Sequence, residues 1–496
     1  MINFFSLLKK TFIYLIVIPF LLVSCSKNGL EPDGSDKPTD PELSKEFNIT
    51  TDKVILRHEF RAAWLTTVGN YDWPPKNVSG DVQKEALISI IDRLKNMNIN
   101  VVLFHVRPTS DAFYHSQLVP WSGYLTGTQG EYPGFDPLAV AIQAAHERGM
   151  ELHAWLNPYR IGSTSIALAS NHPVILHPEW CVVFENNRYL NPGIPEVKAH
   201  LLAVVKEIID NYDVDGIHFD DYFYPSGAKS TTDPFKFNDK ATFEQYGETL
   251  DIHAWREKNV NEMVRDVSQI IKNINPKVVF GISPMGKQEN SMTVYANALS
   301  WIQNKWLDYL APQIYWEIGH ATADFNTVIR YWNINSGGTP IIPGLAAYKY
   351  GDSNYPAYTL QELLNQVSLG RSLNNISGNC WFRVNYILSN TLGTYIKNSI
   401  YPSQSLIPKL GTYNEAVPGY PVVSIYQKNI SWNFIPEATQ YAVYELVRDG
   451  KTVNWNAMAR QISNATSFVA NSAKNYIVIA INGKEKSTYE RVVYVP

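Results

Sequence analysis

Short apolar segments alternate with longer amphipathic stretches between residues 55 and 400, and this alternation constrains the fold more than any other feature of the chain. The short segments have the length and composition of buried strands, and the stretches between them are long enough for helices. Strands that alternate with helices favour a parallel sheet. The pattern predicts eight strands, at residues 59–66, 100–106, 150–156, 214–220, 277–283, 308–315, 340–346 and 378–384.

Helical periodicity is clearest in three of the intervening stretches. The stretch before residue 100 places apolar residues on one face at helical spacing, namely Leu87, Ile90, Ile91, Leu94 and Met97. A second helix is expected to begin at Asp136-Pro137 and to end at Gly149, and a third is expected to begin at Pro195. Further helices are predicted near residues 256–274, 291–306, 359–374 and 388–399.

Eight strand–helix units predict an α/β fold of the (β/α)8 TIM barrel type, because eight parallel strands close around a filled interior. The main alternative is an open doubly wound sheet, which usually carries a glycine-rich phosphate turn after its first strand. Residues 67–73 lack that turn. No internal repeat is visible either, which argues against a solenoid or a propeller.

The pattern changes after Pro408 to short strands separated by turns such as Asp449-Gly450 and Asn482-Gly483. The run ISWNFIPEATQYAVYEL at residues 430–446 resembles a fibronectin type III domain. We therefore expect a barrel domain over residues 51–407 and a small all-β sandwich over residues 408–496.

The N-terminus has the pattern of a bacterial lipoprotein signal. Lys9 and Lys10 precede an apolar run at residues 12–23 that is too short to span a bilayer, and the run ends close to Cys25. We expect residues 1–25 to be a signal peptide, Cys25 to be lipidated, and residues 26–50 to form a flexible tether. The predicted location is the cell envelope, with the protein held on a membrane surface.

Composition excludes some partners and leaves others open. Forty-two Lys and Arg residues against 46 Asp and Glu residues give a net charge of −4, so nucleic acid is not an expected partner. Beyond Cys25, the chain has Cys181 and Cys380, which could form a disulfide or remain buried thiols. The protein is expected to be a monomer without a cofactor.

Carboxylates at the predicted strand ends point to glycoside hydrolysis. Asp220 and Asp221 end the strand at 214–220, and Glu317 follows the strand at 308–315. Residues at the carboxyl ends of barrel strands meet at one face, and cleavage of a glycosidic bond requires two carboxyl groups. We expect Asp220 to act as the nucleophile or charge stabiliser and Glu317 as the proton donor, with Asp221 and His218 tuning the first acid.

Aromatic and polar residues near the same strand ends are candidates for contacting a sugar, because aromatic rings stack on pyranose faces and polar groups bond hydroxyls. The predicted substrate-binding residues are Trp73, His105, Arg107, Asp111, Trp155, Asn157, Tyr159, Arg160, His218, Tyr222, Tyr315, Trp316, Trp381 and Arg383.

Five of these segments carry a family resemblance. The runs EFRAAWLTTVGNYDWP (59–74), VVLFHVRPTSDAFY (101–114), HAWLNPYR (153–160), VDGIHFDDYFYP (214–225) and YLAPQIYWE (309–317) resemble the glycosyl-hydrolase-like family ten. This resemblance implies a bacterial envelope glycosidase with a (β/α)8 barrel and a retaining mechanism. It implies that Asp220 is the nucleophile and that a later carboxylate is the acid/base. It also implies a substrate, namely peptidoglycan glycan strands that have lost their peptides.

Three alternatives remain at this point. The same chemistry could act on dietary or host glycans. A metal-dependent deacetylase could use His105, His153 and His218 with Asp220, although the chain has neither a His-x-His pair nor a His-Glu-x-x-His motif. A non-catalytic glycan-binding lipoprotein would not need several acids at one mouth.

Overall fold

The computed structural model describes residue 47, residues 51–448 and residues 453–496. The predicted signal peptide, Cys25 and nearly all of the predicted tether lie outside these described residues. Within them, no helix combines the length and the apolar character that crossing a membrane would require.

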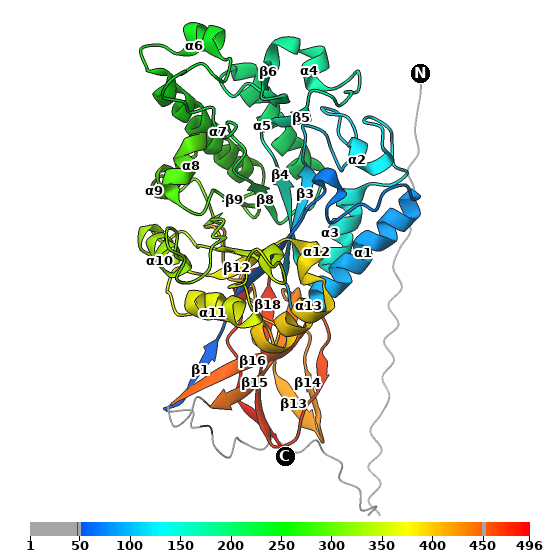
Figure 1. Cartoon of the computed structure of the whole chain (residues 1–496). Helices are drawn as coiled ribbons and strands as arrows, with labels where there is room; N and C mark the ends of the chain where they lie inside the picture. Colours follow the sequence, from blue (N-terminus) through cyan, green and yellow to red (C-terminus); the bar gives the residue numbers. More distant parts are fainter. Residues whose placement is uncertain (1–46, 48–50, 449–452) are drawn as a thin grey trace, which may run out of the picture. The chain divides into compact units, whose positions relative to one another are not determined.

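The eight predicted strands form one closed parallel sheet (Figure 1). The strands are β2 (Phe60–Leu65), β3 (Val101–Arg107), β4 (Glu151–Leu156), β8 (Gly216–Phe219), β9 (Val279–Ile282), β10 (Tyr309–Leu310), β11 (Gly344–Ala346) and β12 (Gly378–Phe382). Their order is β10-β9-β8-β4-β3-β2-β12-β11, and bridges from Leu310 to Ile341 and from Gln313 to Gly344 join the two ends. The predicted TIM barrel is therefore confirmed.

Helices surround this sheet and bury their apolar faces against it. The principal helices are α1 (Gly80–Asn96), α3 (Pro137–Glu147), α5 (Pro195–Asn211), α7 (Ile252–Ile274), α9 (Ala298–Gln303), α10 (Phe325–Asn335), α11 (Leu360–Arg371) and α13 (Asn390–Tyr395). Helix α10 was not predicted, although Phe325, Ile329 and Trp332 bury one of its faces. The helix predicted at 291–306 is interrupted, because Tyr295 adopts a left-handed backbone conformation between two short helical pieces.

Shorter elements occupy the loops of the barrel. They are the helices α2 (Gly123–Thr126), α4 (Pro173–Leu176), α6 (Lys240–Tyr246), α8 (Gln288–Ser291) and α12 (Val384–Ile387), with a small antiparallel sheet of β5 (Arg160–Ser163), β7 (Asn187–Leu190) and β6 (Cys181–Phe184). Cys181 lies in this small sheet and Cys380 lies in β12, and both are free thiols.

The C-terminal strands form a separate sandwich-like domain with its own core. One sheet contains β13 (Val423–Tyr426), β14 (Asn429–Trp432) and β17 (Ser467–Val469). The other contains β15 (Gln440–Arg448), β16 (Asn454–Ser463), β18 (Lys474–Asn482), β19 (Glu485–Lys486) and β20 (Val493–Val495).

A strand from the other end of the chain completes the second sheet. Strand β1 (Lys53–Leu56) pairs in parallel with β16, with Lys53 opposite Asn454 and Leu56 opposite Ala457. The sequence pattern had predicted that these four residues belong to the barrel domain. The structure places them in the sandwich, which is therefore built from two separated parts of the sequence.

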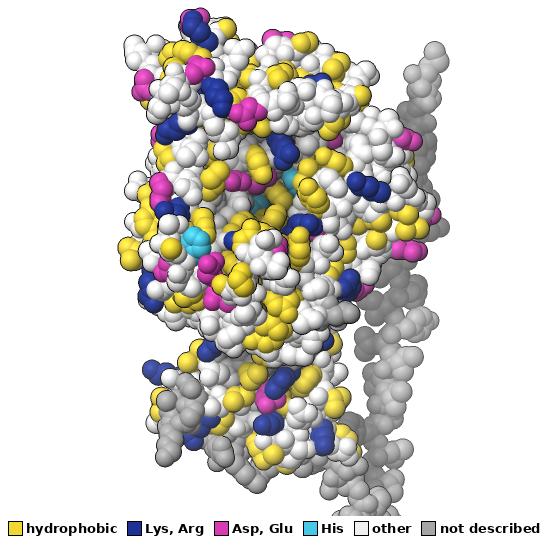
Figure 2. Space-filling view, viewed as in Figure 1, with side chains coloured by type: hydrophobic (Ala, Val, Ile, Leu, Met, Phe, Trp, Pro, Cys, Tyr) yellow, Lys and Arg dark blue, Asp and Glu magenta, His cyan; other side chains and the backbone are white. Residues whose placement is uncertain are grey.

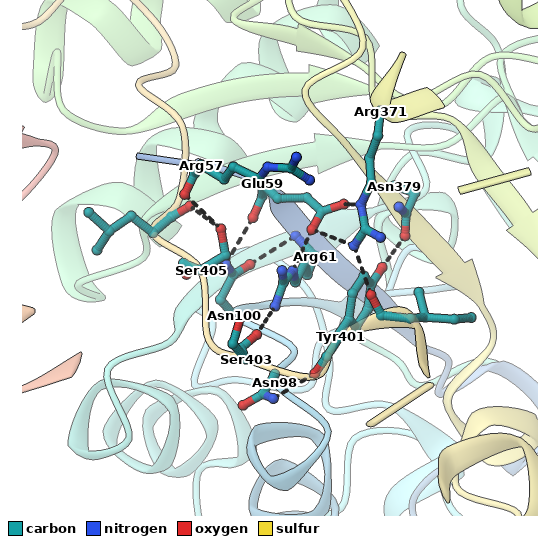
Figure 3. A network of polar contacts seen from close by, with 12 residues as sticks. Arg57, Glu59, Arg61, Asn98, Asn100, Arg371, Asn379, Tyr401, Ser403 and Ser405 are labelled. Carbon is teal, nitrogen blue, oxygen red and sulfur yellow. Dashed lines mark hydrogen bonds and ion pairs between the residues drawn. The ribbon is translucent and has the colours of Figure 1, made fainter. Parts of the chain in front are cut away.

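Buried charges tie strand β2 to the segment that follows the last barrel helix (Figure 3). Glu59 accepts hydrogen bonds from Arg61 Nε at 2.7 Å and from Arg371 Nε and Nη2 at 2.7 and 2.9 Å. Both guanidinium groups lie over the ring of Tyr401, at 4.4 and 5.7 Å from its centre. Asn100 donates to the backbone carbonyls of Glu59 and Ser405, so the same cluster anchors the returning segment.

Replacing Glu59 with Gln should destabilise the protein by about 3 kcal/mol, because breaking a buried ion pair leaves uncompensated charge. Although burial alone raises its pKa, the two arginines hold the pKa of Glu59 below its usual range. The wild type therefore has this contribution above the usual glutamate pKa and loses it as the pH falls through the lowered value. Denaturant unfolding measures the change, with exposed Glu85→Gln as the control. Equal stability of the two variants would contradict the prediction.

Candidate active site

The alternation of strand β8 positions the central acid. Ile217 and Phe219 point outward into the core between sheet and helices, whereas His218 points into the barrel. Asp220 follows directly at the carboxyl end of the strand and is only 4% exposed. Its Oδ2 accepts a hydrogen bond from Trp155 Nε1 at 3.1 Å and a long one from Asn157 Nδ2 at 3.5 Å. A carboxyl group is thus held at the mouth of the barrel.

Two adjacent carboxyl groups, that of buried Asp220 and that of half-buried Asp221, make this point electrostatically unusual. Burial, reinforced by the negative charge of Asp221, raises the pKa of Asp220 to about 8. Burial also raises the pKa of Asp221 to about 6, against a hydrogen bond from the side chain of Gln313. Near neutral pH the two carboxyl groups therefore share one proton and one negative charge.

Below the two aspartates, hydrogen bonds inside the barrel determine which ring nitrogen of His218 carries the proton. Trp64 Nε1 donates to His218 Nε2 at 3.2 Å, and an indole N–H can only donate. The proton of His218 is therefore on Nδ1, which donates to Tyr309 Oη at 2.9 Å. Burial lowers the pKa of His218 well below its usual range, in keeping with a neutral ring. Ser283 Oγ lies 3.1 Å from the same Nε2.

The chain of bonds continues to the other end of the barrel. Tyr309 Oη donates to His153 Nδ1 at 3.0 Å, and His153 Nε2 donates to Glu151 at 3.2 Å. Glu151 in turn forms an ion pair at 3.2 Å with Lys484 of the sandwich.

Two glycines on neighbouring strands make room for these rings. A Cβ atom on Gly216 would lie 2.7 Å from the ring of His153, and one on Gly281 would lie 2.0 Å from the ring of Tyr309. The sequence of β8 and β9 thus allows an aromatic, hydrogen-bonded layer to fill the barrel beneath the acids.

Aromatic rings and two arginines line the mouth around the acids. Arg383 lies between the exposed ring of Tyr71 and that of Tyr386, at 4.8 and 4.9 Å from their centres, and it forms an ion pair with Asp72 at 2.7 Å. Tyr222, which is 46% exposed, lies beneath the guanidinium of Arg160. Figure 2 shows a hollow in the barrel with acidic, basic and histidine side chains inside it and hydrophobic side chains around it.

Several residues predicted to contact substrate are instead enclosed. Trp73, Arg107, Tyr159 and Trp381 are completely buried. Trp73 donates to a carbonyl of helix α1, and Arg107 donates to the carbonyls of Asn157 and Pro158. Because these side chains are enclosed, we expect them to support the loops of the site rather than to bind substrate.

Two further residues that were predicted to contact substrate, Asp111 and His105, are also buried within the loops. Asp111 is buried and accepts hydrogen bonds from Thr109 and Gln129. His105 stacks on Trp155 with 3.8 Å between ring centres, which orients the indole that bonds Asp220.

Glu317 lies in a different environment from the aspartates. It is half-buried, and its charge interacts with Lys349 and Tyr358. None of the contacts recorded for the described residues joins its side chain to Asp220 or Asp221. Tyr315 and Trp316, on the same loop, are half-buried.

Gln313, Trp64 and Tyr309 were not predicted from the sequence as site residues. Gln313 contacts Asp221 and donates to the carbonyl of Ser283 at 3.0 Å. Gln313 could have been recognised from the sequence, because it is a polar residue inside a largely apolar strand segment. Trp64 and Tyr309 looked like ordinary core residues, since only the structure shows which polar atoms they face.

The three histidines considered for a metal site are engaged otherwise. His153 and His218 both bond Tyr309 Oη, and His105 stacks on Trp155. Among the described residues, no three His, Cys, Asp or Glu side chains are grouped to hold a metal ion.

Comparison with known families assigns the chain. The model of the family described as Glycosyl hydrolase-like 10 matches residues 59–358. The chain belongs to this family. The matched residues include every barrel strand from β2 to β11, together with Asp220 and Asp221.

Curated relatives agree with the Glycosyl hydrolase-like 10 assignment. The chain is 34% identical over 455 residues to "Glycosyl hydrolase YngK" of Bacillus subtilis (strain 168), covering 84% of this chain and 88% of that protein. It is 32% identical over 421 residues to "Glycosyl hydrolase DigH" of Escherichia coli (strain K12), covering 75% and 92%. Membership of the family supports hydrolysis of glycans as the activity.

Among solved structures, the glycoside hydrolase domain of PgaB (BpsB) from Bordetella bronchiseptica is similar to this chain with a TM-score of 0.48 and 13% sequence identity. The similarity covers 69% of this chain and 98% of that domain.

Proposed function

We propose that this protein hydrolyses glycosidic bonds in peptidoglycan glycan strands that lack peptides, with Asp220 as proton donor and Asp221 as the anion beside it. One observation carries the chemistry: two adjacent carboxyl groups at the end of β8, one buried and one half-buried, both have raised pKa values and share one proton near neutral pH. Glycoside hydrolysis needs one protonated and one ionised carboxyl group at the same time.

In the proposed mechanism, the Asp220 proton passes to the glycosidic oxygen as the bond from that oxygen to the anomeric carbon breaks. The carboxylate of Asp221 stabilises the positive charge that develops on the sugar ring. Water then adds to the anomeric carbon, and the proton that it releases returns to Asp220. Trp155 and Asn157 hold Asp220 in place throughout.

This assignment differs from the sequence-based expectation, in which Asp220 was the nucleophile and Glu317 the donor. The raised pKa of Asp220 suits a donor, because a nucleophile must be ionised. Retention of configuration, which the family resemblance implies, stays a prediction that nuclear magnetic resonance of the first-formed anomer can test.

The activity should depend on pH as a bell-shaped curve. Below about pH 6 Asp221 takes up a proton and loses its charge, and above about pH 8 Asp220 loses the proton that it must donate. We expect kcat/KM to fall on both sides of this range, measured on one soluble oligosaccharide. Activity that keeps rising above pH 9 would contradict the assignment of Asp220 as donor.

The substrate follows from the family resemblance and suits the predicted location. A protein anchored by a lipidated Cys25 in the cell envelope would meet wall glycans, and the exposed rings of Tyr71, Tyr222 and Tyr386 offer surfaces for sugar faces. We keep the envelope location and the lipid anchor as part of this proposal.

Product analysis tests the proposal directly. Residues 47–496 are incubated with peptide-free glycan strands and, separately, with a panel of plant and host glycans, and the products are identified by mass spectrometry. We expect soluble fragments from the peptide-free strands only. Cleavage of a panel glycan instead would keep the chemistry and assign a nutritional role, whereas binding without cleavage would indicate a glycan-binding protein.

A further inference from the structure

Arg160 is a cation at the mouth for which the described residues supply no ion-pairing carboxylate. Its backbone is fixed on both sides, because its N–H donates to Asn157 Oδ1 at 3.0 Å and its carbonyl accepts from Ser110 Oγ at 3.0 Å. Its guanidinium lies 5.4 Å from the centre of the Tyr222 ring and interacts electrostatically with Asp220. Within the described part of the chain, this guanidinium forms no ion pair with a carboxylate.

The second arginine at the mouth provides a contrast. Arg383 forms an ion pair with Asp72 at 2.7 Å, so its positive charge is already balanced within the protein. Within the described part of the chain, the guanidinium of half-buried Arg160 makes no hydrogen bond, and the ring of Tyr222 lies beneath it at 5.4 Å. A planar guanidinium held in this way is suited to bind a carboxylate through two parallel hydrogen bonds.

The proposed substrate offers such a group. In a glycan strand stripped of its peptides, every muramic acid residue carries a free carboxylate on its lactyl ether. In a strand that bears peptides, the same carboxyl group is an amide and has no charge. We propose that Arg160 binds this free carboxylate and thereby selects peptide-free strands. This inference rests on the proposed function and adds the residue that determines its specificity.

Binding a carboxylate at Arg160 would also support the chemistry. The positive charge of Arg160 opposes the rise in the pKa of Asp220 that burial and Asp221 cause. A substrate carboxylate neutralises that charge, so Asp220 holds its proton more firmly once the substrate is bound. Recognition and protonation of the donor are then coupled through one side chain.

The test compares two forms of one substrate. Peptide-free strands are used as they are, or after carbodiimide coupling has converted their carboxyl groups to methylamides. The wild type should have a kcat/KM about tenfold or more in favour of the free carboxylate, because a hydrogen-bonded ion pair discriminates by that much. Arg160→Gln should bring this ratio close to one, mainly through KM, and Arg160→Lys should give an intermediate ratio.

The control is Arg330→Gln, which removes an exposed arginine of α10 that donates a hydrogen bond to Asn326 of the same helix. It should keep the wild-type ratio. The inference is overturned if the wild type cleaves both substrates equally well, or if Arg160→Gln lowers both rates by the same factor, since Arg160 would then only tune Asp220. If the wild type cleaves neither substrate, the proposed function itself fails.

Discussion

Asp220→Asn should lower kcat on peptide-free glycan strands by about a thousandfold, within the range that general acid catalysis contributes. The amide keeps the size of the side chain and can still meet the indole of Trp155, but it has no proton of suitable acidity to give to the leaving oxygen. Fold integrity is checked by thermal unfolding. Turnover at the wild-type rate would exclude Asp220 from the chemistry.

A second substrate shows which role Asp220 has. A dinitrophenyl glycoside of the same sugar has a leaving group that needs no proton, so a variant that lacks only the donor should cleave it almost as fast as the wild type does. Glu317→Gln is assayed in parallel. If Glu317→Gln shows this dependence on the leaving group and Asp220→Asn does not, the donor is Glu317, as the sequence first indicated.

Asp221→Asn should lower kcat by about a hundredfold or more, because a charge that stabilises the transition state is lost. The same change removes the negative charge that helps to raise the pKa of Asp220. The alkaline limb of the pH profile should therefore move to lower pH, and the acidic limb should disappear. A profile that kept both limbs would show that Asp221 does not titrate in the reaction.

The matched control for both variants is Asp210→Asn. Asp210 is an exposed carboxylate on helix α5 that pairs with Lys206 of the same helix. Asp210→Asn removes one negative charge, as Asp221→Asn does, whereas Asp220→Asn removes none while Asp220 is protonated. The rate and the pH profile of Asp210→Asn should be those of the wild type. A large effect here would mean that overall charge, rather than the local pair, governs the activity.

The fold could be predicted largely from the sequence because strand and helix signals in a barrel are local. Each of the eight strands was visible as an apolar run, and capping residues such as Asp136 marked helix starts. Strand β1 could not be placed in this way. The four residues of β1 carry no local sequence signal that their partner is β16, which begins at Asn454.

The candidate site could also be predicted in part from the sequence. Alternation along β8 was enough to place Asp220 and Asp221 at the barrel mouth, since side-chain direction follows from period two. The same reasoning could not separate Trp155, which bonds Asp220, from Trp73 and Trp381, which are buried behind the loops. Which aromatic residues reach a cleft depends on how the loops fold over them, and that is not encoded in strand periodicity.

The pairing of β1 with β16 also decides how the protein would respond to mechanical load. A pull on the chain ahead of Lys53 acts along β1, parallel to its partner strand. The hydrogen bonds of the ladder are then loaded together in shear rather than opened one after another. The sandwich would therefore resist the force before it reaches β2. A pull on the chain end would then leave the geometry of Asp220 and Asp221 unchanged.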